Sequence, residues 1–170
     1  MTKDHQRRLS DVYERVYASE KTVKLLKSAG RVSVIITVAI FLALICFALT
    51  VGVIEAAKLL ALAGAPFIIV SALRMVMKSE RPYELIDFSD FSGEPPHRKS
   101  GASFPSRHVF SAFLIALLAF EYAWYLGAVA IFAGVVLAIS RVLLGIHFAK
   151  DVVCGAIIGV ISGVIGILIL

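Results

Sequence analysis

The chain has 170 residues, 59% of them hydrophobic, and a mean hydropathy of +0.90. These values exclude a soluble globular domain and indicate one integral membrane domain, residues 1–170. The formal net charge of +5 does not indicate a nucleic-acid-binding protein, because the sequence has no aromatic stacking platform or matching fold signature.

Residues 1–31 form a polar N-terminal segment with eight basic and four acidic side chains. Apolar residues recur within it at helical spacing: Leu9, Val12, Tyr13, Val16 and Tyr17. This pattern predicts an amphipathic helix that lies on the bilayer surface and binds anionic headgroups. The first apolar stretch beyond it lacks a small-residue cleavage site, so we expect no cleavable signal peptide.

Five apolar stretches follow, at residues 32–51, 53–77, 105–120, 123–143 and 149–170. A spanning helix needs about 20 residues and can manage with about 17, so we expect the third stretch to gain length from its flanks. The sequence therefore predicts an all-α integral membrane protein. Its core, residues 32–170, is a bundle of about five transmembrane helices, preceded by the interfacial helix.

A polar interruption at residues 78–104 separates the second and third apolar stretches. Phe88 and Phe91 lie among its charges, and two interpretations stay open. The segment is either an active-site loop that folds over a lipid site or a solvated connector anchored at the interface. His97 is interpreted as an ordinary loop residue.

Small residues within the apolar stretches have structural interpretations. Cys46 and Cys154 have no partner at metal-ligand spacing and are interpreted as packing residues. Gly155, Gly159 and Gly163 form a stripe along one helix face, which favours close packing within the bundle over dimerisation.

Polar residues interrupt the apolar sequence in three islands: Arg74-x6-Arg81-Pro82, Pro105-Ser106-Arg107-His108 and Ser140-Arg141-x5-His147-x3-Asp151. Connectivity brings all three to one face of the membrane. So many cations on one face are costly unless an anion lies among them. His147 and Asp151 are four residues apart, which on a helix would let the carboxylate hold one imidazole nitrogen and leave the other free.

The three islands resemble the tripartite signature of the type 2 phosphatidic acid phosphatase family, which shares its phosphate site with the vanadium haloperoxidases. The chain is similar to a short bacterial integral-membrane member. Family members commonly have six spanning helices, so the resemblance implies that one is missing here and that the amphipathic segment takes its place. Two positions depart from the pattern, because Arg74 stands where Lys is usual and Arg107 where Gly is usual.

The resemblance also implies the roles of the site residues. His147 is the nucleophile that forms a phosphohistidine, Asp151 orients it, and His108 protonates the leaving group and then activates water. The phosphate-binding residues are Arg74, Arg81, Ser106, Arg107 and Arg141. Arg107 either crowds or reinforces the phosphate site. We expect no metal and no cofactor, since the arginines already supply the positive charge.

We therefore expect a membrane lipid-phosphate phosphatase. Phosphatidylglycerophosphate, phosphatidic acid, a polyprenyl diphosphate and lipid A phosphates all stay open as substrates. A phosphotransferase with the same intermediate and a non-catalytic lipid-phosphate binder are the alternatives. We expect a multi-pass protein of the cell (inner) membrane, and the resemblance implies an extracytoplasmic site. The expected topology puts the basic N-terminus on the same face as the site, whereas the positive-inside rule would place that N-terminus in the cytoplasm. The oligomeric state stays open.

Overall fold

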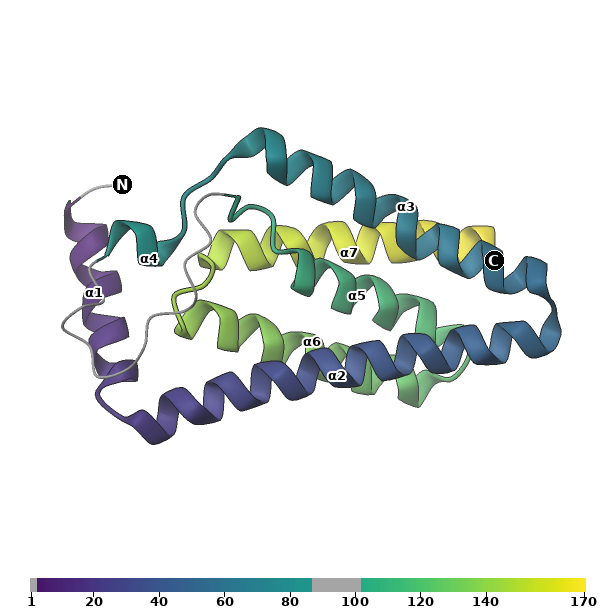
Figure 1. Cartoon of the computed structure of the whole chain (residues 1–170), viewed down its shortest axis with the longest axis horizontal. Coiled ribbons are helices and arrows are strands. Elements are labelled where there is room, and N and C mark those ends of the chain that lie inside the picture. The colour runs from purple at the N-terminus through teal and green to yellow at the C-terminus, as the bar shows by residue number, and fades with distance from the viewer. Residues whose placement is uncertain (1–2, 87–101) are drawn as a thin grey trace.

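The computed structural model describes residues 3–86 and 102–170, and Figure 1 labels its helices. In chain order they are α1 (Lys3–Tyr17), α2 (Glu20–Val51), α3 (Val53–Met77), α4 (Pro82–Leu85), α5 (Arg107–Phe120), α6 (Trp124–Leu143) and α7 (Ala149–Ile169). No strand occurs in the described residues, so the all-α prediction is confirmed. The interpretations of Phe88, Phe91 and His97 lie outside the described residues.

The bundle is organised around α5, which contacts α2, α3, α6 and α7 (Figure 1). Phe110, Leu114 and Leu118 of α5 are fully buried and form the centre of the apolar core. Four of the described helices, α2, α3, α6 and α7, are long and apolar enough to cross a membrane. The fifth apolar helix, α5, is shorter than these four.

The expected lengthening of this third apolar stretch was wrong. The helix has 14 residues, which is about 21 Å of rise against a hydrocarbon core of about 30 Å. The preceding residues 102–106 are not helical, and Ser103, Pro105 and Ser106 are buried. Non-helical backbone is tolerated at membrane depth when protein surrounds it, and here other helices surround α5.

The glycine stripe of α7 faces α5, as predicted for packing within the bundle. A Cβ atom at Gly155 would lie 2.7 Å from the carbonyl oxygen of Ser106, and one at Gly159 would lie 2.5 Å from that of Phe110. Only a residue without a side chain lets the two backbones approach this closely. The stripe therefore fixes α7 against the start of α5.

The predicted N-terminal segment 1–31 was too long. The first helix, α1, ends at Tyr17, and α2 continues without a break from Glu20 to Val51, about 48 Å. Ser19 caps α2, because its hydroxyl accepts a hydrogen bond from the Thr22 amide at 3.4 Å. No proline lies within α2, so residues 20–31 extend the first spanning helix instead of lying on the membrane.

The apolar face of α1 packs on protein. Figure 1 shows α1 across one end of the bundle. Tyr13 and Tyr17 are buried there against Leu144, whereas Val12 is 44% exposed. The Tyr17 hydroxyl donates to the Leu144 carbonyl at 3.2 Å. An amphipathic pattern predicts an apolar partner without saying whether that partner is lipid or protein, and the most buried apolar side chains of α1 contact protein.

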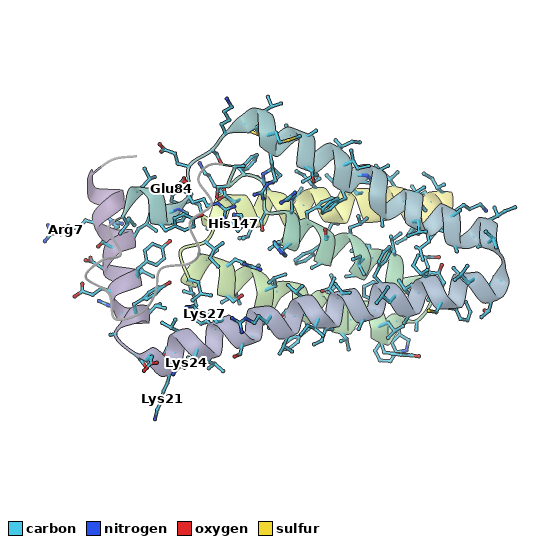
Figure 2. All side chains as sticks on the ribbon, viewed as in Figure 1. Arg7, Lys21, Lys24, Lys27, Glu84 and His147 are labelled. Carbon is cyan, nitrogen blue, oxygen red and sulfur yellow. The ribbon has the colours of Figure 1, made fainter. Side chains whose placement is uncertain are left out.

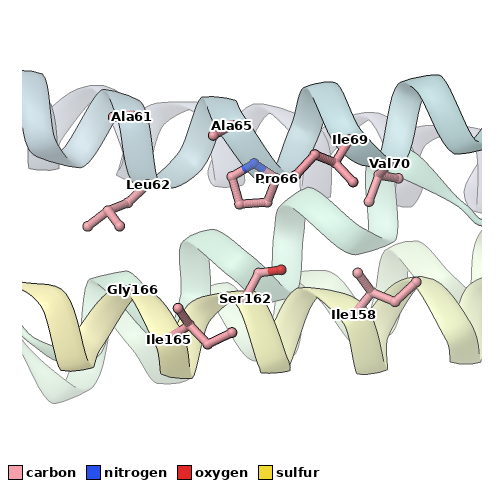
Figure 3. Close-up of a pocket in the computed structure, with 10 residues that line it drawn as sticks. All are labelled: Ala61, Leu62, Ala65, Pro66, Ile69, Val70, Ile158, Ser162, Ile165 and Gly166. Atoms are coloured by element: carbon pink, nitrogen blue, oxygen red, sulfur yellow. The ribbon is translucent and has the colours of Figure 1, made fainter.

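The outer parts of the bundle pack less closely. An apolar crevice of about 310 Å³ separates α3 from α7, with Pro66 and Ser162 facing each other across it (Figure 3). Of the two unpaired cysteines, Cys154 is partly buried but Cys46 is exposed on α2. The packing interpretation of Cys46 was therefore wrong, because an apolar membrane helix has a lipid-facing side as well as a buried one.

Candidate active site

The three polar islands meet at the end of the bundle that α1 covers, where Figure 2 labels His147. The Arg74 guanidinium donates to the Pro105 carbonyl at 2.6 Å, which joins the first island to the second. The Ser106 amide donates to the Asp151 carbonyl at 3.0 Å, which joins the second to the third. The predicted convergence on one face is confirmed.

The buried segment 102–106 is held from the end of α3. Arg74 donates to the carbonyl of Ala102 as well as to that of Pro105. The Ser103 amide donates to the Ser79 carbonyl at 2.9 Å, and the following amide donates to the Ser79 hydroxyl at 2.9 Å. Arg74 was predicted to bind phosphate. In the structure two of its donors position the backbone of this segment, and three N–H groups remain.

His147 lies in the turn between α6 and α7. Gly145, at φ 67°, supplies the left-handed residue that this turn needs, and the His147 amide donates to the Arg141 carbonyl at 3.2 Å. The His147 side chain is 3% exposed. The expectation that His147 and Asp151 share a helix face was wrong in detail, since α7 begins at Ala149 and only Asp151 is helical.

A serine absent from the predicted site connects the two residues. The His147 Nδ1 and Asp151 Oδ2 atoms are 3.6 Å apart, beyond a normal hydrogen bond. The hydroxyl oxygen of Ser103 lies 3.2 Å from that Nδ1 and 2.5 Å from that Oδ2, so it bridges them. Ser103 and Asp151 are fully buried. The available signal in the sequence was a hydroxyl two residues before Pro105, at the start of an apolar stretch.

The hydrogen-bonding capacity of these groups assigns the imidazole tautomer. An ionised carboxylate only accepts, so the Ser103 hydroxyl donates its one hydrogen to Asp151. Its oxygen can then only accept from His147, which places a hydrogen on Nδ1. The other nitrogen, Nε2, carries a lone pair. Asp151 Oδ2 also accepts from the Phe148 amide at 3.0 Å, which fixes the carboxylate in the first turn of α7.

Charge and burial keep this imidazole neutral. Burial lowers the pKa of His147 below its ordinary value of 6.5, and the cationic Arg81 and Arg74 lower this pKa further. The Asp151 carboxylate acts in the opposite direction, because it favours the imidazolium. A neutral His147 with its lone pair on Nε2 is the form that can attack phosphorus.

Two of the predicted phosphate ligands carry unsatisfied polar atoms. Within residues 3–86 and 102–170, the Ser106 hydroxyl oxygen and Arg141 Nε are buried without a hydrogen-bond partner, as is Asp151 Oδ1. Leaving such a group unpaired typically costs about 1–3 kcal/mol. Arg81 lies nearby, with Nη1 3.5 Å from the Ile146 carbonyl oxygen. An anion bound here would satisfy the two donors.

His108 and Arg107 occupy another side of the site. Both side chains are exposed and line a cavity of about 360 Å³ that also borders α2, α3 and α6. The Arg107 guanidinium turns toward α3, where Nη1 lies 3.5 Å from the Ser71 hydroxyl and Cζ lies 5.8 Å from the centre of the Phe67 ring. This cavity adjoins the position from which His108 could protonate a leaving group.

Comparisons with known proteins concern the family and the fold of the chain. A sequence profile of the PAP2 superfamily matches residues 55–170. The fold is similar to the crystal structure of Aquifex aeolicus LpxE, with a TM-score of 0.68, 20% identity and coverage of 93% of both chains. It is also similar to a PAP2-type phosphatidylglycerolphosphate phosphatase from Bacillus subtilis, with a TM-score of 0.70, 19% identity and coverage of 99% of this chain and 87% of that one. No curated protein sequence matches the chain.

Proposed function

This chain belongs to the PAP2 superfamily, and from that premise we propose that it is a metal-independent membrane phosphatase that hydrolyses a lipid phosphate through a phosphohistidine on His147. One observation carries the proposal. Two buried donors, on Ser106 and Arg141, have no partner among the described residues and lie in the same site as a histidine whose tautomer is set by Ser103. The donors suit an anion, and the histidine suits attack on it.

Phosphate binding is assigned to the cationic and hydroxyl groups of the site. Arg81 and Arg141, with the remaining N–H groups of Arg74, would hold the non-bridging oxygens. Ser106 stands at the N-cap of α5, so its hydroxyl and the first amides of the helix add donors where the helix dipole favours an anion. Guanidinium groups supply the charge that a metal ion supplies in other phosphatases.

The first step forms the covalent intermediate. Nε2 of His147 attacks phosphorus in line while the bond from phosphorus to the lipid oxygen breaks. The imidazole becomes cationic as the new bond forms, and Ser103 relays the stabilising effect of the Asp151 carboxylate to Nδ1–H. His108 donates a proton to the departing lipid oxygen.

The second step releases phosphate. His108, now neutral, takes a proton from water, and the resulting hydroxide attacks phosphorus. The bond from phosphorus to Nε2 breaks, its electron pair returns to His147, and inorganic phosphate leaves. A non-catalytic binder would have no use for the Ser103–His147–Asp151 chain, which supports catalysis over binding alone.

A lipid substrate is favoured by the placement of the site. The cavity beside His108 is bordered by apolar residues of four helices, including Val38, Phe67, Ile115 and Leu137. A lipid chain could occupy it while the phosphate lies among the arginines. A small water-soluble ester would leave these apolar surfaces unused.

The proposed site faces the extracytoplasmic side of the membrane, by analogy with the family. Lys21 lies at the end of the bundle that carries the site (Figure 2), and Glu121 lies beyond the opposite end of α5. Single cysteines introduced by Lys21→Cys and Glu121→Cys, in a background with Cys46→Ala and Cys154→Ala, test this with a membrane-impermeant thiol reagent. Labelling of intact cells at residue 121 and not at residue 21 would contradict the proposed sidedness.

Phosphate release from long-chain phosphatidic acid, phosphatidylglycerophosphate and a polyprenyl diphosphate tests the activity of the purified protein in detergent. We expect release in excess EDTA, inhibition by vanadate, and an acid-labile phosphoprotein that is absent from His147→Ala. Loss of activity on chelation, restored by magnesium, would contradict the metal-independent mechanism. Transfer of phosphate to an added lipid alcohol in place of water would instead identify a phosphotransferase.

A further inference from the structure

The cavity beside His108 contains a positive charge that has no carboxylate partner among residues 3–86 and 102–170. Arg107 lines the cavity and is exposed, and its described contacts are to the neutral Ser71 hydroxyl and the Phe67 ring. Among the residues that the structure describes, no Asp or Glu oxygen lies within 4.0 Å of this guanidinium. A guanidinium cannot lose its charge near neutral pH, so the cavity combines apolar walls with a fixed cation.

The position of this cation matches one part of a substrate. If His108 protonates the departing oxygen, the group bonded to that oxygen must extend past His108. The cavity containing Arg107 starts at that point. A second cavity of about 220 Å³ shares Phe67, Ser111 and Ile115 with it and continues the apolar surface between α3 and α5. A leaving group in this cavity would thus meet both the cation and the apolar walls.

Leaving groups differ in whether they carry charge next to the broken bond. A lipid monophosphate such as phosphatidic acid releases an alcohol, which needs a proton and carries no negative charge next to the broken bond. In phosphatidylglycerophosphate the remaining phosphodiester charge is separated from the broken bond by a glycerol unit. A lipid diphosphate releases a lipid monophosphate, whose non-bridging oxygens gain negative charge as the bond breaks. A planar guanidinium donates two parallel hydrogen bonds to such oxygens and acts most strongly where water is scarce.

The geometry points to Arg107 as the ligand of a second phosphate, in the leaving group, so that the preferred substrate class is a lipid diphosphate. This inference rests on the proposed phosphatase function. In the reaction, the terminal phosphorus transfers from the bridging oxygen to Nε2 of His147. The bridging oxygen keeps the electron pair and receives its proton from His108. The lipid monophosphate then leaves past Arg107, and water releases inorganic phosphate from the histidine.

The test compares two substrates that differ by one phosphate. Initial rates give kcat/KM for farnesyl diphosphate and for farnesyl monophosphate in the same detergent micelles, using the full-length chain. The variants are Arg107→Gln, Arg107→Lys and Arg107→Gly, the last placing the family's usual residue at this position. The matched control is Lys150→Gln, which removes an exposed cation at the start of α7, outside the cavity.

We expect the ratio of kcat/KM, diphosphate over monophosphate, to fall about tenfold to hundredfold in Arg107→Gln and Arg107→Gly, the range typical of a lost charge-assisted hydrogen bond. Arg107→Lys should keep part of the ratio, because it keeps the charge but not the fork. Lys150→Gln should leave the ratio unchanged.

A ratio within threefold of wild type in both Arg107→Gln and Arg107→Gly would overturn the inference while leaving the phosphatase function intact. An equal fall in Lys150→Gln would also overturn it, since general surface attraction would then explain the preference. If the wild-type chain releases phosphate from phosphatidic acid but does not hydrolyse farnesyl diphosphate, the inference alone is overturned. If it hydrolyses neither farnesyl ester nor phosphatidic acid nor phosphatidylglycerophosphate, the proposed function is overturned as well.

Discussion

The two sides of the site are built in opposite ways. On the nucleophile side, Ser103, His147 and Asp151 are buried and joined by hydrogen bonds, and the glycine stripe fixes α7, which carries Asp151, against α5. On the leaving-group side, His108 and Arg107 are exposed and face an apolar cavity toward α2 and α3.

This difference follows from what each side has to do. The nucleophile must present one nitrogen in one tautomer, which requires fixed partners and little water. The leaving-group side must admit and release a long apolar molecule, which requires open space between helices. Among the described residues of that side, the charge on Arg107 is the feature that we propose selects among lipids.

The largest expected effect concerns His147, on the nucleophile side of the site. We expect His147→Ala to lower kcat on the order of 10⁴-fold or more, because the variant lacks the nitrogen that forms the proposed covalent intermediate. Circular dichroism and thermal unfolding in detergent check that the variant is folded. Activity within tenfold of wild type would remove the nucleophile assignment and leave the buried side without a function.

Ser103→Ala tests the hydrogen-bonded link on the nucleophile side, and we expect a smaller effect than that of His147→Ala. We expect kcat to fall about 10- to 100-fold with little change in KM, because the link between the Asp151 carboxylate and His147 is lost. Ser103→Thr, which keeps the hydroxyl, should recover part of the activity.

The pH profile separates this role from a packing role. The Asp151 carboxylate raises the pKa of His147, so weakening its effect in Ser103→Ala lowers that pKa further. The acid limb of the kcat/KM profile should therefore move to lower pH, while Ser103→Thr keeps the wild-type limb. An unmoved limb in Ser103→Ala would contradict the relay.

On the leaving-group side we expect a smaller effect on kcat/KM that depends on the chain length of the substrate. Ser111 lines the cavity of about 360 Å³ beside His108 and also the cavity of about 220 Å³ that shares residues with it. Ser111→Phe should therefore obstruct the path of the lipid. We expect kcat/KM for a long-chain phosphate to fall about tenfold relative to its short-chain analogue, since lost chain contacts also misplace the phosphate. Val129→Phe, on the exposed surface of α6, is the size-matched control. Equal losses for both chain lengths would show that the lipid does not use these cavities.

The smallest expected effect concerns α1. Tyr17→Phe removes the hydrogen bond to the Leu144 carbonyl, at the start of the turn that carries His147. We expect a loss in kcat of about threefold, since one neutral hydrogen bond contributes about 1 kcal/mol and the turn keeps its other contacts. Burial raises the pKa of Tyr17, so the hydroxyl stays a neutral donor through the assay range and this loss should not vary between pH 6 and 9. A loss above a hundredfold would mean that α1 belongs to the site.

The sequence predicted those features for which the residue types present allow one structural arrangement of low free energy. Apolar length predicted α3, α6 and α7 almost to the residue, and the cost of exposed cations in a membrane predicted the meeting of the three islands. The bridging Ser103 could not be predicted, because a serine before a helix has many possible partners and the 3.6 Å separation of His147 and Asp151 exists only in three dimensions. The backbone role of Arg74 was hidden for the same reason.

The shortness of α5 has a consequence for how the protein is made. A 14-residue segment is too short to enter a bilayer as an independent spanning helix, so we expect the insertion machinery to accept it only together with α6, as a hairpin turned at residues 121–123. The Ser106 amide then stays unsatisfied until α7, which is synthesised after α6, brings the carbonyl of Asp151 to it. A nascent chain that stops after α6 therefore lacks His147 and also lacks the hydrogen bond that holds the start of α5. The protein should become active only after α7 has packed against α5.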